Sequence, residues 1–240
     1  MFENIKRGFT LAEVLITLGI IGVVAALTIP TLMNNYQKSQ YVTGLKKAYT
    51  EINQALVQVA ADRGCIGDLK CTGLFTFDSS DFGSEFVKYF NAIKNCEKNS
   101  GCFSNEVIVK DHYDGTGNLT GYDDWTSGMY RFITADGMVF SIDQAGDCST
   151  DLSSNVTNNL TQYCADIYID VNGIQGPNYL GRDIFMYYIT NGKGPLLYPY
   201  EGVDDGSNGY WKDNNYCDPS HNDDWGCVAR IMDEGWQMNY

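Results

Sequence analysis

The chain has 240 residues, of which 44% are hydrophobic and 19% are charged. It is therefore long and apolar enough to bury a core, and disorder as the overall state is excluded. Thirty Asp and Glu residues stand against 16 Lys and Arg residues, which gives a formal charge of −14. A field of this sign repels phosphate backbones, so nucleic acid is not expected as a partner.

An almost unbroken apolar run occupies residues 9–32, FTLAEVLITLGIIGVVAALTIPTL. As a helix it would be about 36 Å long, which is enough to cross a bilayer once. Lys6 and Arg7 directly precede the run, so the positive-inside rule leaves the short N-terminus in the cytoplasm and sends the rest of the chain outside. The alternative is a cleaved secretory signal, because Val24-Ala25-Ala26 offers the small residues that such a cleavage site uses.

Glu13 lies deep inside this apolar run. An ionised side chain there costs on the order of 2.5 to 3.5 kcal/mol unless a partner neutralises it. A carboxylate in a membrane segment therefore indicates a functional residue.

The residues before and around Glu13, KRGFTLAE at 6–13, resemble the N-terminal processing signal of type IV pilins and type II secretion pseudopilins. In that family a membrane aspartic peptidase, prepilin peptidase, cuts after the glycine and methylates the new N-terminal phenylalanine. The resemblance implies a cut between Gly8 and Phe9, with Phe9 as the methylated N-terminus. It also implies an assembly role for Glu13 and a helix kink at Pro30.

The resemblance further implies a bacterial inner-membrane precursor with a single span, which later becomes a periplasmic or cell-surface filament. Its partners would be prepilin peptidase, the inner-membrane assembly machinery and other pilin-like subunits in a homo- or hetero-polymer. Cleavage creates an α-amine that hydrocarbon disfavours, and Glu13 of a neighbouring subunit would neutralise it. Alternatively, Glu13 meets the amine of its own chain one turn away.

Helical spacing continues beyond the membrane run, so one helix is predicted over about 9–62, with Gly64 as its stop. A second amphipathic helix is predicted over 80–95, capped by Ser80 or Asp81. Strands are predicted at 106–110, in a hairpin of 130–134 and 138–142, at 167–171 with one solvent-facing side, and at 184–189 as the more buried strand. A long loop region follows at 199–227.

This order of elements predicts an α+β fold. A long kinked N-terminal helix, membrane-spanning in its first half, would pack on an antiparallel sheet in a pilin-like head with disulfides. The expected organisation is a leader peptide at 1–8, a transmembrane and assembly helix at 9–32, the amphipathic half of the helix at 33–63, and an extracytoplasmic head at 64–240.

Eight cysteines all follow the apolar run, which favours disulfides in an oxidising compartment over the alternative of metal binding. No C-x-x-C occurs, and His112 and His221 form no zinc-type spacing with the thiols. Eight cysteines allow 105 pairings. We predict pairing in chain order, as Cys65 with Cys71, Cys96 with Cys102, Cys148 with Cys164, and Cys217 with Cys227.

A calcium site is a weak candidate in the head, because Asp170, Asn172 and Asp183 bracket a glycine-rich loop with hard oxygen ligands. The alternative is that Asn172-Gly173 and Pro177-Asn178 are simply turn formers, and the loop does not match an EF-hand. No other cofactor is expected. The acidic loop at 204–224 has a similar density of carboxylates but is better explained as a solvated surface.

No catalytic motif is present, so an enzyme is not expected. The sequence predicts a structural subunit, a pilin or pseudopilin, of a type IV pilus-like or type II secretion filament. The alternative is a minor tip subunit or adhesin-like binding module with an acidic, disulfide-stapled head.

Overall fold

The computed structural model describes residues 10–76, 78–101, 103–110, 120–144, 146–151, 162–191, 196–199, 217 and 225–240. The chain forms two compact units, residues 1–40 and 41–240. The helical elements are α1 (Leu11–Asp62), η1 (Lys70–Thr72), α2 (Ser79–Phe86), η2 (Val87–Tyr89), α3 (Tyr122–Trp125), η3 (Gly173–Gln175) and α5 (Cys227–Asp233). The strands are β1 (Ala92–Glu97), β2 (Ile108–Val109), β3 (Thr120–Gly121), β4 (Tyr130–Thr134), β5 (Val139–Asp143), β6 (Tyr163–Asp170), β7 (Ile184–Thr190) and β8 (Leu197–Pro199).

The long N-terminal helix is confirmed as α1, which continues through Pro30 without ending there. The kink at Pro30 stays a prediction. The helix ends where the sequence indicates, because Gly64 takes a positive φ of 70°, which glycine adopts without a steric penalty. The amide of Cys65 donates to the Ala60 carbonyl and that of Gly64 to the Ala61 carbonyl, which is a Schellman termination.

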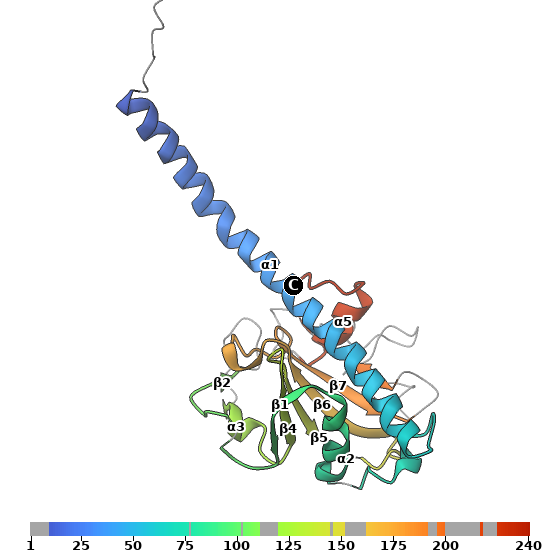
Figure 1. Cartoon of the computed structure of the whole chain (residues 1–240). Coiled ribbons are helices and arrows are strands. Elements are labelled where there is room, and N and C mark those ends of the chain that lie inside the picture. Colours follow the sequence, from blue (N-terminus) through green and yellow to red (C-terminus); the bar gives the residue numbers. More distant parts are fainter. Residues whose placement is uncertain are drawn as a thin grey trace, which may run out of the picture. The chain divides into compact units, whose positions relative to one another are not determined.

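The head is built on a six-stranded sheet in the order β1-β4-β5-β6-β7-β8, in which all neighbours are antiparallel. Figure 1 shows the sheet beside α2 and the C-terminal half of α1. The predicted hairpin is confirmed as β4 and β5, and Gly137 has a φ of 90° in its turn. The α+β fold with an antiparallel sheet is therefore confirmed.

One face of the sheet is covered by helices. In α1 the side chains at a helical spacing of three and four residues are buried from residue 41 onward, and they join α2 and α5 in the main hydrophobic core. Leu45, Ile52 and Leu56 are fully buried there. Each such side chain contributes roughly 1.5 to 3 kcal/mol by leaving water, so the second half of α1 is part of the core of the head.

The opposite face of the sheet is covered as well, which corrects the prediction of a solvent-facing side for residues 167–171. Asp170 is only 1% exposed. Val139 and Ile184 on this face pack with Phe103 and Tyr122 in a second apolar cluster. Phe103 and Tyr122 lie between β1 and β4 in the chain and cover this end of the strands, and the alternation in β6 does not reveal that cover.

The predicted helix over 80–95 is wrong in its second part. Helical structure ends with η2, and residues 92–97 form the edge strand β1, paired with β4. Ile93, assigned to the apolar face of that helix, is 69% exposed. The cap is Asp78, whose carboxylate accepts the Ser80 amide at 2.8 Å, and not Ser80 or Asp81.

Three of the four predicted cysteine pairs are disulfides in the structure, namely Cys65–Cys71, Cys148–Cys164 and Cys217–Cys227. Cys96 is also disulfide-bonded. Its predicted partner, Cys102, lies outside the described residues. No described cysteine is free, which agrees with an oxidising compartment. The strand predicted at 106–110 is shorter in the structure, where β2 covers only Ile108–Val109. Strand β8 and helix α5 were not predicted.

Candidate functional site

The N-terminal end of α1 holds the residues on which the sequence analysis centres. Gly8 and Phe9, the predicted cleavage site, lie outside the described residues, and the described chain starts at Thr10. Glu13 is in the first turn of α1.

The Glu13 carboxylate is bound by its own chain. Its Oε2 accepts the Thr10 backbone N–H at 2.8 Å and the Thr10 hydroxyl at 2.9 Å. In return, the Glu13 amide donates to Thr10 Oγ1 at 3.3 Å. This reciprocal arrangement is a capping box, which satisfies donors that the first turn of a helix leaves free. The sequence carries the signal as Thr10-x-x-Glu13, although the capping box was not among the features predicted from it.

The capping box changes what Glu13 does in a single chain. The sequence allows two partners for this carboxylate, the amine of a neighbouring subunit and the amine of its own chain. In the structure the partner is Thr10, one turn earlier. Glu13 is therefore partly satisfied before any second subunit arrives.

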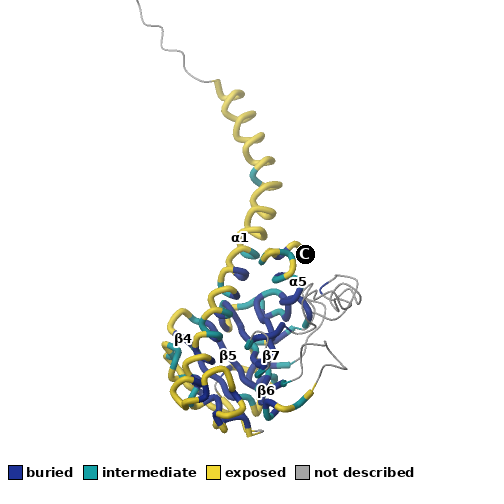
Figure 2. Tube along the Cα trace, turned by 90° about the vertical axis from the view of Figure 1, so that its right-hand side faces the viewer, coloured by how far each residue is buried: buried dark blue, intermediate teal, exposed yellow. Residues whose placement is uncertain are grey.

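The N-terminal half of α1 is exposed in the described part of the chain. Its 18-residue apolar window is 0% buried, and the helix is long and apolar enough to span a membrane. Figure 2 shows the exposed colour along almost all of this segment. A row of large apolar side chains is exposed, among them Leu15, Ile16, Leu18, Ile20, Ile21, Val23, Leu27 and Leu32. Gly19 and Gly22 have no other atom within 4 Å of an added Cβ, so another helix can approach closely at these positions.

The comparison with known families bears directly on this segment. Residues 4–29 match the family described as the prokaryotic N-terminal methylation motif. The chain carries this motif. It is the hallmark of the signals of type IV pilin and pseudopilin precursors, and the match spans the predicted cleavage site, Glu13 and most of the apolar run. No curated protein and no solved structure matches the chain.

The motif and the helix that follows it bear on the class of protein. The motif supports a type IV pilin-like or pseudopilin precursor, and the motif together with the apolar helix fits anchoring in the inner membrane before entry into a surface or periplasmic filament. The motif implies processing by prepilin peptidase and assembly into pilus-type polymers. It points to a structural subunit more than to an enzyme.

A second candidate site lies in the head, at the residues proposed for calcium. Asp170 and Asp183 are 1% and 0% exposed. Asp183 accepts the backbone amides of Asn178 and Tyr179 at 2.9 and 2.7 Å. Asp170 accepts the Tyr122 hydroxyl at 3.2 Å and the Asn172 amide at 3.3 Å. No described Lys or Arg forms an ion pair with either carboxylate.

The electrostatics of this site favour a positively charged partner or a bound proton. Burial and the neighbouring Asp183 raise the pKa of Asp170 well above its usual value, and burial raises the pKa of Asp183 to about 6. Asn172 Oδ1 and Asn178 Oδ1 are buried without a hydrogen-bond partner. Buried oxygens of this kind normally have one. Two carboxylates and two orphaned amide oxygens in one loop thus fit a hard cation in their chemistry.

The number of acidic ligands at this site is small. Among the described residues, no group of three or more Asp, Glu, His or Cys side chains is placed to hold a metal ion. A cation here would have to draw its remaining ligands from amide and backbone oxygens, which calcium accepts.

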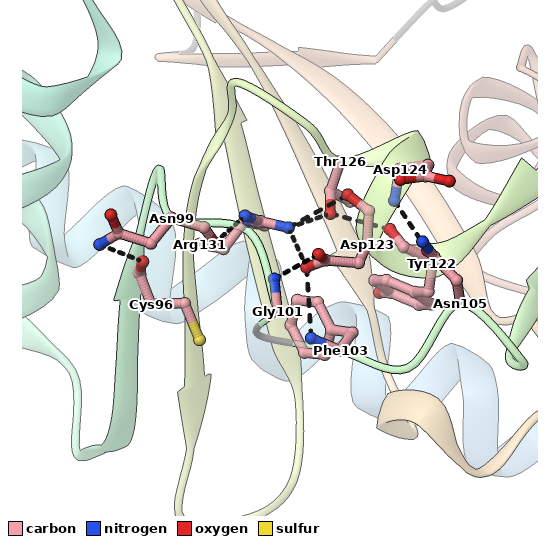
Figure 3. A network of polar contacts seen from close by, with 10 residues as sticks. All are labelled: Cys96, Asn99, Gly101, Phe103, Asn105, Tyr122, Asp123, Asp124, Thr126 and Arg131. Atoms are coloured by element: carbon pink, nitrogen blue, oxygen red, sulfur yellow. Dashed lines mark hydrogen bonds and ion pairs between the residues drawn. The ribbon is translucent and has the colours of Figure 1, made fainter.

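A buried ion pair, also missed from the sequence, stabilises the cover of the sheet (Figure 3). Arg131 on β4 is 0% exposed. Its Nη1 donates to Asp123 Oδ1 at 2.7 Å and to the Thr126 hydroxyl at 2.9 Å. The same carboxylate accepts the amides of Gly101 and Phe103 at 2.5 and 3.3 Å. The pair joins three segments of the chain and leaves no reactive group exposed, so we interpret it as structural.

Proposed function

We propose that this chain is a structural subunit of a type IV pilus-like or type II secretion filament, processed between Gly8 and Phe9 and polymerised through α1. The observation that carries the proposal is the position of the methylation motif, directly before a helix whose apolar half is uncovered. A helix that is apolar on all sides must be buried by lipid or by other helices. In the precursor, membrane insertion would bury the apolar half of α1. In the filament, packing against other copies would bury it.

Assembly in this proposal exchanges the partner of Glu13. Cleavage leaves a charged α-amine on Phe9, directly before Thr10. In a single subunit Glu13 binds the neutral donors of Thr10. The amine of a neighbouring subunit is a charged donor, so it adds the attraction between two opposite charges to a hydrogen bond that the carboxylate already strengthens. The new pair also neutralises two charges in a medium of low dielectric constant.

The partner exchange would also set the register between subunits. One amine and one carboxylate are available per chain, four residues apart. Each incoming helix would therefore slide along its neighbours until its amine meets a Glu13, and Gly19 and Gly22 permit the close approach that this contact needs.

The intact mass of the mature protein tests this proposal. A chain that starts at Phe9 and carries one added methyl group supports it, whereas a start near Leu27 would show ordinary signal peptidase cleavage and overturn it. Labelled heads on sheared filaments then separate the alternatives. Label along the whole filament indicates a major subunit, and label confined to one end indicates a minor tip subunit or binding module.

We also propose that Asp170, Asn172 and Asp183 bind calcium in the head. The two orphaned amide oxygens favour this over a purely turn-forming role. Extracellular calcium modules have dissociation constants of about 10⁻⁴ to 10⁻³ M, so 10 mM calcium would stabilise the head by up to about 2.7 kcal/mol if binding lies at the tight end of that range.

The test compares the thermal unfolding of the full chain, in detergent, with calcium, with magnesium and with a chelator. We expect calcium to raise the midpoint and Asp183→Asn to abolish this shift. An equal midpoint in calcium and chelator would show that Asn172 and its neighbours only form the turn.

A further inference from the structure

A second pair of carboxylates lies on the same face of the sheet as Asp170. Asp143 on β5 is the direct partner of Asp166 on β6 in the antiparallel register. Side chains directly opposite in such a pair have their Cβ atoms about 4.5 to 5.5 Å apart, and like charges there are destabilising. The arrangement therefore opposes ionisation of both groups at once.

The groups that face the pair do not supply a positive charge. On β6, the Tyr163 hydroxyl donates to Asp166 Oδ1 at 2.8 Å. On β7, Tyr188 is the register partner of Asp166, and its ring contacts the ring of Tyr163 edge-on at 5.4 Å. No Lys or Arg in the described part of the chain forms an ion pair with either carboxylate.

The surroundings of Asp166 favour its protonated form. Burial raises its pKa to about 7, and the charge of Asp143 acts in the same direction, while the Tyr163 hydroxyl opposes them. Near neutral pH a small change in acidity would therefore place two negative charges face to face.

The residues directly after this pair are held along the start of β6 by backbone hydrogen bonds, one of which runs from the Tyr163 amide to the Thr150 carbonyl at 2.9 Å. Residues 146–150 return along the start of β6, where the Gly146 amide donates to the Cys164 carbonyl at 3.2 Å and the Cys148 amide to the Tyr163 carbonyl at 3.0 Å. A Cβ at Gly146 would lie 2.5 Å from the Tyr163 carbonyl oxygen, so this approach is as close as glycine allows. The disulfide of Cys148 with Cys164 keeps the segment attached even when these hydrogen bonds open.

We propose that Asp143 and Asp166 form a pH-sensitive latch that closes residues 146–150 onto β6 in acid and releases them above neutral pH. Tyr163 couples the two parts, because its hydroxyl binds Asp166 while its carbonyl binds the Cys148 amide. Ionisation of Asp166 opposite Asp143 pushes β5 and the following segment away from the start of β6.

The sign of the effect on stability follows from linkage. The carboxyl of Asp166 in the unfolded chain loses its proton near pH 4, whereas the folded head keeps it to about pH 7. Stability therefore falls as pH rises between these values and then levels off. For this one proton, the folding equilibrium constant falls by up to tenfold per pH unit.

Hydrogen exchange and denaturant unfolding of the full chain in detergent test the latch between pH 5 and 8.5, with the calcium concentration fixed by a chelator. After correction for the intrinsic exchange rate, we expect exchange at residues 146–150 to accelerate at least several-fold above pH 7. Asp166→Asn and, independently, Asp143→Asn should abolish this acceleration. Asp166→Asn should also flatten the fall in stability between pH 5 and 7.

The matched control is Glu106→Gln, which removes one exposed carboxylate outside the pair and should retain the acceleration of the unmodified chain. The latch is refuted if exchange at 146–150 does not depend on pH in the unmodified chain. It is also refuted if the asparagine variants show the same acceleration above pH 7 as the unmodified chain. Either Asn variant is sufficient for the comparison if the other does not fold.

Discussion

Glu13→Gln tests the partner exchange at the membrane end of α1 most directly. Glutamine keeps the shape of the side chain and still accepts the Thr10 donors, since capping boxes use Glu or Gln at this position. Only the charge is removed. The first turn of the helix and the cleaved subunit in the membrane should therefore remain intact. The amine of each incoming subunit, however, finds no counter-charge.

The expected magnitudes separate the two roles of Glu13. Loss of one partner of a buried ion pair costs about 3 to 5 kcal/mol, and about 1.4 kcal/mol corresponds to a factor of ten. Glu13→Gln should therefore lower filament assembly by at least about a hundredfold. Loss of a helix cap costs about 1 kcal/mol, or roughly fivefold.

Thr10→Ala is the complementary variant, because it removes the two hydrogen bonds of the Thr10 hydroxyl, one to Glu13 Oε2 and one from the Glu13 amide. It keeps the carboxylate and the hydrogen bond from the Thr10 backbone N–H. We expect it to lower assembly by no more than a few-fold. The assay is the amount of subunit in sheared filaments relative to the membrane pool, with cleavage of each variant verified by intact mass. Assembly of the Glu13→Gln protein at a near-normal level, or an equal loss in both variants, would refute charge pairing.

Three further predictions concern processing and the head. Gly8→Ala should leave the uncleaved precursor as the main species by intact mass, because a methyl group must enter a peptidase subsite that the family fills with glycine. Loss of the Cys148–Cys164 disulfide should cost about 3 kcal/mol in denaturant unfolding, and loss of the shorter Cys65–Cys71 loop about 2.4 kcal/mol, in the chain-entropy estimate; the reverse order would contradict it. Gly83→Ala should lower the unfolding midpoint, since its Cβ would lie 2.2 Å from the Tyr130 ring and overpacking costs roughly 1 to 3 kcal/mol; an unchanged midpoint would show that the ring moves freely.

The elements predicted correctly from the sequence are those whose cause is local. The apolar run and its helical continuation define α1, and Gly64 ends it because only a residue that tolerates positive φ fits there. The β4 and β5 hairpin follows from Asp136-Gly137 between two apolar stretches. Residues 184–189 of β7 are apolar or aromatic throughout, and the strand is buried along its whole length as expected.

The errors arise where long-range contacts override a local pattern. The aromatic residues of 80–90 continue a helical spacing into residues 91–95, yet those residues gain more by pairing with β4. Ile93 is left exposed as a result. Helix propensity differs by only tenths of a kcal/mol between such residues, so a few strand hydrogen bonds decide the outcome.

The candidate sites divide in the same way. Glu13 stands out in the sequence because the free-energy cost of a carboxylate in hydrocarbon can be judged without knowing the fold. The capping partner Thr10 was equally readable, as a motif of four residues. The Arg131 and Asp123 pair could not be read, because its partners Gly101 and Phe103 meet it only after the cover of the sheet has formed.

The acids of β6 show why the pattern of a strand does not fix its environment. Asp166, Tyr168 and Asp170 alternate with Ile167 and Ile169, which indicates one apolar and one polar face but does not say that water lies beyond the polar one. In the structure Tyr122 reaches Asp170 and Asp143 stands opposite Asp166. A polar face that is partly covered brings like charges together where solvent screens them less than at an open surface. The same alternation that favoured a wet strand therefore produces both carboxylate pairs of the head, and each needs a cation or a proton that a solvent-facing strand would not.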